Sequence, residues 1–157
     1  MFRILFLFFT LSISAQTSKV YQKNKDISGR IVSEGWLIDG QKSEYWFTYH
    51  KDNSVASKGH FQQGLKEKYW YFYRGNGILE KEGHYAKGLM SDWWVFYDVS
   101  GNMICKIQFK AGKKEGYCLQ YNSGKIVKVE KFKSDVKLGE WDDLDSFQKE
   151  NDLKDLM

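Results

Sequence analysis

Aromatic and aliphatic residues alternate with polar ones in short runs along most of this chain, and the whole pattern returns every 24 residues. The residues that recur at this interval are Gly40, Gly64, Gly88 and Gly112; Trp46, Trp70 and Trp94; Phe61, Tyr85 and Phe109; and Tyr49, Tyr73, Tyr97 and Tyr121. A fixed period of this length is typical of repeat architectures, in which each unit buries its apolar face against its neighbours.

Each repeat contains two candidate strands. Residues Lys66 to Tyr73 and Ile78 to Tyr85 are rich in aromatic and β-branched residues, and glycine-containing turns separate them. Hairpins in series form an antiparallel meander. We therefore predict an all-β fold, an elongated single-layer antiparallel meander of β-hairpin repeats. The loop Lys110-Ala111-Gly112 and its equivalents are predicted to be three-residue hairpin loops that end in a left-handed glycine.

The alternation of residue types assigns the two faces of the predicted sheet. With three-residue loops and an even period, all odd-numbered residues share one face, which carries most of the tyrosines and aliphatic residues. The even-numbered residues are mainly charged or polar, apart from an aromatic stripe. We therefore expect the odd face to form the core and the even face to be hydrated. The stripe on the even face consists of Trp46, Trp70, Trp94, Phe72 and Phe96.

Three glycines occur inside predicted strands, where glycine ordinarily weakens a sheet. Gly35, Gly59 and Gly83 occupy the same position of successive repeats. We predict that an aromatic ring from the next strand lies over the bare backbone at each of them.

The two ends of the chain differ from the repeats. Residues 1–15 contain Arg3, an apolar run and small residues up to Ala15, which is the order of a secretory signal peptide cleaved near Ala15. Residues 16–26 are predicted to be a linker or edge segment, and 27–141 the repeat array. Residues 142–157 are acidic and favour helix, so we predict a short helical cap.

The composition and charge of the chain limit the classes of macromolecule that it is expected to bind. The chain has 157 residues, which suits one domain, and its formal net charge is only +4. Basic residues are interleaved with acidic ones, so the concentrated positive patch of a nucleic-acid-binding protein is missing from the sequence. With the predicted signal peptide, the protein is expected to be extracytoplasmic, in the periplasm or secreted.

Three stretches carry a resemblance to a known family. They are GLKEKYWYFYRGNG from Gly64, GLMSDWWVFYDVSG from Gly88 and GKKEGYCLQYNSG from Gly112. The pattern resembles the MORN-repeat variant of bacterial proteins, which are often described as antitoxin components of toxin–antitoxin systems. The second glycine of that motif is present as Gly116 but is replaced by Lys68 and Asp92. The resemblance implies an elongated, twisted single sheet that acts as an interaction scaffold.

Catalytic chemistry has little support in the sequence. His60 and His84 occupy equivalent positions two strands apart, roughly 9.5 Å, which is too far to share one metal ion. The sequence contains no nucleophile motif, phosphate-binding glycine loop or zinc-type cysteine spacing. We therefore predict a non-enzymatic protein with no catalytic residues, no metal site and no cofactor.

The aromatic stripe of the even face is the candidate binding site. Trp46, Trp70 and Trp94 are predicted to contact a partner, with Phe72 and Phe96 as flanking contacts. The alternative is a second apolar seam that is covered by the stems of neighbouring lysines.

The predicted function is that of a scaffold for a macromolecular partner. A protein is the first choice, with a glycan or a membrane surface as alternatives and nucleic acid excluded. An antitoxin or immunity-type protein that neutralises one toxin is the main alternative function, and an aromatic-ladder glycan-binding module is another. A homodimer through an exposed apolar sheet face is a further candidate assembly.

The two cysteines are expected to remain unpaired. A three-residue loop at Lys110-Ala111-Gly112 places Cys105 and Cys118 on opposite faces of the sheet, so that no disulfide forms. A two-residue loop would instead place Cys105 directly opposite Cys118.

Overall fold

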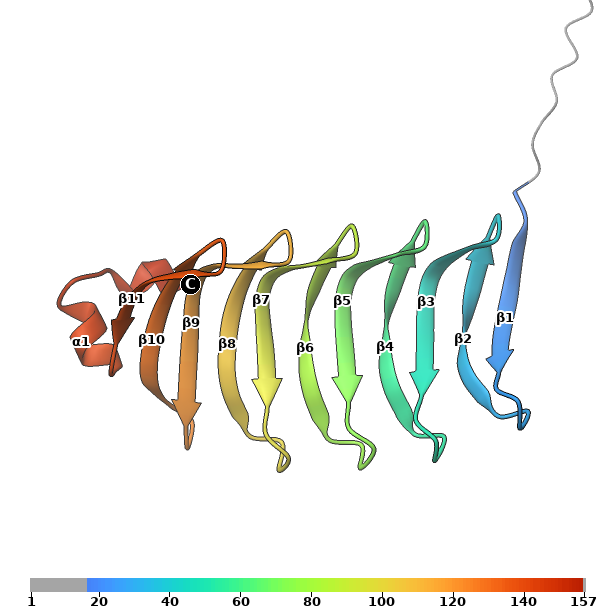
Figure 1. Ribbon diagram of the computed structural model, residues 1–157, viewed down its shortest axis with the longest axis horizontal. Helices are drawn as coiled ribbons and strands as arrows, with labels where there is room; N and C mark the ends of the chain where they lie inside the picture. The colour runs from blue at the N-terminus through green and yellow to red at the C-terminus, as the bar shows by residue number, and fades with distance from the viewer. Residues whose placement is uncertain (1–16, 157) are drawn as a thin grey trace, which may run out of the picture.

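The computed structural model describes residues 17–156, which form one open antiparallel sheet of eleven strands with a short helical segment at its C-terminal end (Figure 1). The predicted signal peptide lies outside the described residues. The strands are β1 (Lys19–Lys25), β2 (Ile31–Ile38), β3 (Gln41–Tyr49), β4 (Val55–Gln62), β5 (Leu65–Tyr73), β6 (Leu79–Ala86), β7 (Leu89–Tyr97), β8 (Met103–Lys110), β9 (Lys113–Asn122), β10 (Lys125–Lys133) and β11 (Val136–Trp141).

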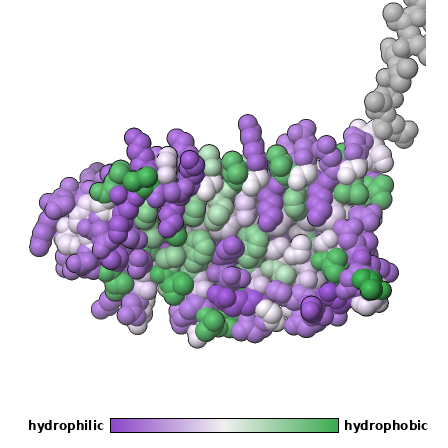
Figure 2. All heavy atoms as spheres, in the orientation of Figure 1, coloured by the Kyte–Doolittle hydropathy of each residue, from purple (hydrophilic) through white to green (hydrophobic). Residues whose placement is uncertain are grey.

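Every strand pairs with its neighbours in sequence, so the sheet is a meander without crossovers. This confirms the predicted all-β meander with its regular hairpin period. The sheet begins at Lys19, and the stretch predicted as a linker or edge segment therefore contributes the edge strand β1, which pairs with β2. Hydrophilic residues gather along the two rims of the visible face, and apolar residues lie between them (Figure 2).

The hairpin loops differ from the prediction. Lys110 lies opposite Lys113, so the loop consists of two residues, Ala111 and Gly112, rather than three. Their φ angles of 50° and 80° place both in the left-handed region. Two-residue loops of this kind follow the right-handed twist of the flanking strands, which explains why they replace the longer loop.

A bulge interrupts the first half of each long strand. In β3, Trp46 lies opposite Gly35, whereas Ser43 lies opposite the next residue, Trp36, so two residues of β3 are unpaired on this side. One of them, Glu44, has φ of 60°. The equivalent positions in the next three repeats also have positive φ: Lys68 at 61°, Asp92 at 59° and Gly116 at 101°. Figure 1 shows that β3, β5 and β7 bend sharply near their beginnings.

The predicted assignment of faces is wrong, because the connections between the strands are not the three-residue loops on which it depended. Gln62 pairs with Leu65 across a two-residue loop, and at the other end of the hairpins the pairing shifts by one residue, as between Thr48 and Tyr49. Odd-numbered Phe61, Tyr85 and Phe109 therefore share a face with even-numbered Trp46, Trp70 and Trp94. We call this side the Trp face. The opposite side, the Tyr face, carries the following residues: Tyr45, Phe47, Tyr49, Tyr69, Tyr71, Tyr73, Trp93, Val95, Tyr97, Tyr117, Leu119 and Tyr121.

The predicted C-terminal cap is present as two short helical turns, α1 (Leu144–Gln148) and the 3₁₀ turn Leu153–Leu156. Asp143 caps α1 by accepting a hydrogen bond from the Ser146 amide. Phe147 is fully buried and packs edge-on against Tyr117 and Trp141. The cap therefore covers the Tyr face at β9–β11, where it forms one buried cluster with the sheet.

The prediction for the strand glycines is confirmed. A Cβ atom placed on Gly35, Gly59 or Gly83 would overlap the indole ring of the tryptophan on the next strand. Each glycine is the cross-strand partner of that tryptophan: Gly35 of Trp46, Gly59 of Trp70 and Gly83 of Trp94. The indoles therefore lie directly on the bare backbone of the preceding strand.

Replacing Gly59 by Ala should destabilise the protein by about 1–3 kcal/mol, because the added methyl group displaces the Trp70 ring from a close-packed site. Urea unfolding monitored by circular dichroism measures the change. Gly75→Ala is the matched control, since no heavy atom lies within 4 Å of a Cβ at Gly75. Equal free energies of unfolding for the two variants would contradict the packing described.

Candidate interaction surfaces

The three tryptophans of the predicted binding stripe are buried. Trp46 and Trp70 are each 1% exposed and Trp94 is 0% exposed. Each indole N–H donates a hydrogen bond of 2.9 Å to a backbone carbonyl of the preceding strand, at Trp36, His60 and His84 respectively. The prediction that they form an exposed contact ladder is therefore wrong, because these rings are the core of the repeats.

Aromatic residues near the hairpin tips close over the indoles. The Phe61 ring meets Trp46 and Trp70 edge to face, with ring centroids 6.0 and 5.0 Å apart. The Tyr85 ring meets Trp94 in the same way at 5.0 Å. Rings on adjacent strands thus contact one another on the Trp face. Edge-to-face pairs add to the stabilisation from burial.

The flanking residues of the predicted site keep partial exposure. Phe72 lies between Trp70 and Trp94, with ring centroids 5.9 and 6.0 Å away. Phe96 lies 6.4 Å from Trp94. Both side chains are half-buried on the Trp face. Of the five predicted contact residues, these two are the ones that a partner could reach.

Lysines cover the same face. The Lys42 ammonium lies 4.3 Å from the centre of the Trp46 ring, and that of Lys66 lies 4.6 Å from Trp70 and 4.8 Å from Phe72. The Lys81 ammonium, on the adjacent strand β6, lies 5.1 Å from the centre of the Phe72 ring. This arrangement corresponds to the alternative given in the sequence analysis, a second apolar seam covered by lysine stems. The ammonium groups make cation–π contacts with the rings.

Lys42, Lys66 and Lys81 form no ion pairs with the described part of the chain, residues 17–156. Burial lowers the pKa of Lys66, and the positive charges of Lys81 and Lys42 lower it further. Sequence reasoning missed this group, although Lys42 and Lys66 recur at the same 24-residue interval as the aromatic residues.

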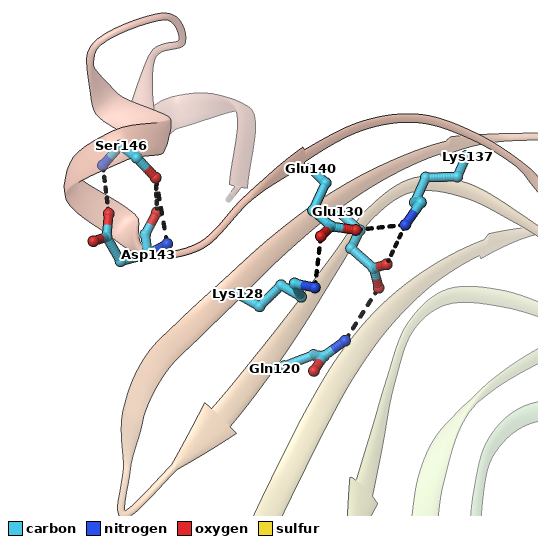
Figure 3. A network of polar contacts seen from close by, with 7 residues as sticks. All are labelled: Gln120, Lys128, Glu130, Lys137, Glu140, Asp143 and Ser146. Atoms are coloured by element: carbon cyan, nitrogen blue, oxygen red, sulfur yellow. Dashed lines mark hydrogen bonds and ion pairs between the residues drawn. The ribbon is translucent and has the colours of Figure 1, made fainter.

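At the C-terminal end of the sheet the charges are paired. Glu140 binds Lys128 at 2.6 Å and also pairs with Lys137, while Glu130 accepts a hydrogen bond from Gln120 (Figure 3). These hydrogen bonds to lysine lower the pKa of Glu140 to about 2. Lys128 and Lys137 are therefore paired with a carboxylate, whereas Lys42, Lys66 and Lys81 in the central repeats are not paired with one among the described residues.

The cysteine geometry also differs from the prediction. Cys118 lies opposite Ile107, and Cys105 lies opposite Gln120, so both cysteines are on the Trp face rather than on opposite faces. A regular hairpin with a two-residue loop would place Cys105 directly opposite Cys118. The bulge in β9 shifts the pairing by two residues, so the two cysteines lie diagonally across adjacent strands. Both thiols are free in the structure.

On the Tyr face, charged side chains bind tyrosine hydroxyl groups. The Tyr49 and Tyr97 hydroxyls each donate a hydrogen bond of 2.6 Å, to Glu34 and Glu82 respectively. Burial, followed by these carboxylates, raises the pKa of both tyrosines. His60 and His84, the residues considered for metal binding, also lie on this face.

The two histidines pack edge-on against tyrosine rings. His60 contacts Tyr45 and His84 contacts Tyr69, with ring centroids 5.0 and 4.7 Å apart. Within residues 17–156, no three His, Cys, Asp or Glu side chains come together as metal ligands. No helix in this part of the chain is long and apolar enough to cross a membrane. Comparisons with protein-family models and with curated proteins find no match to this sequence.

Cys118 should react far more slowly than an ordinary thiol. Burial, followed by the nearby Cys105 and Glu130, raises the pKa of Cys118 to about 12, so only about one molecule in ten thousand is a thiolate at pH 8. Mass spectrometry after iodoacetamide treatment should find Cys118 unmodified in the native protein and alkylated in denaturant. Native alkylation at the denatured rate would contradict the buried position.

Proposed function

We propose that this protein is a non-enzymatic repeat scaffold that binds an acidic segment of a partner protein along the Trp face. The observation that carries the proposal is the group of Lys42, Lys66 and Lys81, whose ammonium groups lie on aromatic rings without an ion-pair partner. Like charges held near one another on a folded surface repel, and an anionic partner relieves that repulsion.

The repeat geometry favours an extended partner. Lys42 and Lys66 occupy equivalent positions two strands apart, which corresponds to roughly 9.5 Å along the sheet. Phe72 and Phe96 supply half-buried aromatic surface beside the lysines. A segment that crosses the strands could place carboxylates near successive ammonium groups and apolar side chains against these rings.

The resemblance to bacterial MORN-repeat variants agrees with a scaffold role, and we keep the extracytoplasmic location suggested by residues 1–15 as part of the proposal. The glycan-binding alternative loses its support, because sugar rings need exposed aromatic faces and the three indoles are buried. An antitoxin role would be one special case of binding a protein partner.

The test measures binding of fluorescein-labelled poly-L-glutamate by fluorescence anisotropy at low salt. Lys42, Lys66 and Lys81 are replaced together by Met, which keeps an apolar stem over the rings and is the residue that the chain itself has at position 90. We expect affinity to fall by about tenfold or more, since each factor of ten corresponds to about 1.4 kcal/mol. Binding by the unchanged protein should weaken as salt rises.

The control variant replaces three exposed lysines in or beside turns, Lys51, Lys87 and Lys110, by Met and changes the net charge equally. Its affinity should change by less than about twofold, because the charge of these side chains is screened in solvent. An equal loss in both variants would show that only net charge matters and would overturn the assigned site. Thermal melting confirms that both variants are folded.

A further inference from the structure

A line of residues crosses the Tyr face from β1 to β9 and carries charges of alternating sign. Each member lies directly opposite the next on the adjacent strand. We call it the central row, and its members are Lys23, Glu34, Phe47, Lys58, Tyr71, Glu82, Val95, Lys106 and Leu119. On the even-numbered strands β2, β4, β6 and β8 the charges are therefore negative, positive, negative and positive.

Contacts place these charged groups among the aromatic side chains of the Tyr face. Lys58 lies 5.2 Å from the Tyr71 ring centre and 5.4 Å from that of Tyr73, and Lys106 lies 5.0 Å from Trp93. Glu34 and Glu82 bind tyrosine hydroxyls on the same side. All four charged residues are half-buried, so they retain partial exposure at fixed positions.

We propose that a second copy of this chain packs face to face on the Tyr face, related by a two-fold axis that runs parallel to the strands along β5. This axis brings β4 of one copy over β6 of the other, and β2 over β8. Lys58 then meets Glu82 of the second copy, and Glu34 meets Lys106, while Tyr71 meets Tyr71. When the order of the four charged strands is reversed, every negative charge faces a positive one, so the surface is complementary to a second copy of itself.

The charge order selects this axis over the other face-to-face arrangement. A two-fold axis perpendicular to the strands keeps the strand order. Each strand would then lie over the same strand of the second copy, for example β4 over β4, so that charges of the same sign would face each other. The axis along the strands reverses the order and preserves height along each strand. The members of the central row therefore remain level, with apolar Phe47 opposite Val95 between the two pairs of charges.

Aromatic residues flank the central row on both sides and obey the same symmetry. Tyr45 would lie over Trp93 of the second copy, and Tyr49 over Tyr97. Tyrosine, tryptophan and phenylalanine are enriched in protein–protein interfaces, and a single-layer sheet needs a second layer to bury a broad aromatic face. At β9–β11 the cap already provides that layer through Phe147.

The cap leaves room for the second copy. Helix α1 contacts β10 and β11. With the axis on β5, strand β9 of one copy lies over β1 of the other, so β10 and β11 project beyond the partner sheet. Because Phe147 of the cap also packs on Tyr117 of β9, the cap limits the contact to strands β2–β8 of each copy, which carry all four charged residues.

Charge reversal tests the proposal through sedimentation velocity and light scattering on the full mature chain. Lys58→Glu and Glu82→Lys each place like charges across the two-fold axis, and each should raise the dimer dissociation constant by about tenfold or more. An equimolar mixture of the two variants restores both oppositely charged pairs, so it should dimerise within about threefold of the unchanged protein. A single chain with both substitutions should behave like the mixture.

The control is Lys81→Glu, which makes the same charge change on β6 but on the Trp face, and its dimer should be unaffected. A monomeric unchanged protein at about 100 µM, a mixture that stays monomeric, or equal weakening by Lys81→Glu would each overturn the proposal. Should either single variant fail to melt cooperatively, the double-substituted chain alone decides. Poly-L-glutamate binding, which depends on the opposite face, distinguishes this outcome from failure of the proposed function.

Discussion

The indole ring resting on the bare backbone of a glycine is the contact on which the rest of the structure depends. A single-layer sheet has no second layer to bury its side chains, yet Trp70 is 1% exposed. This burial requires a partner strand without a side chain at Gly59, and it requires a bend that brings Phe61 over the ring. Because the same contact recurs at Gly35 and Gly83, each repeat supports the next.

The two faces of the sheet acquire different properties from this arrangement. On the Trp face the tryptophan rings are buried by packing, and the accessible groups are mainly lysines that lie over the rings. The Tyr face keeps broad, half-buried aromatic surface with fixed charges between the rings. We therefore propose anion recognition for the first and self-association for the second, with the C-terminal cap as an intramolecular example of how the Tyr face is covered.

The period, the hairpins and the indole-on-glycine contacts could be predicted because they depend on residue spacing and side-chain size. The bulges could not, since Glu44 and Lys68 occupy a left-handed conformation that their residue types disfavour. Gly116 at the equivalent position was the available signal. Missing the two-residue loops led to the wrong faces for Cys105 and Cys118, and missing the bulges led to treating the buried tryptophans as exposed.

Hydrogen exchange of the indole N–H groups, followed by NMR, tests this account most directly. Trp46, Trp70 and Trp94 donate to backbone carbonyls from fully buried positions, so their indole protons should exchange only on unfolding. The indole protons of Trp36 and Trp93 should exchange much faster, because both rings are partly exposed. Exchange of all five at similar fast rates would contradict the tryptophan core.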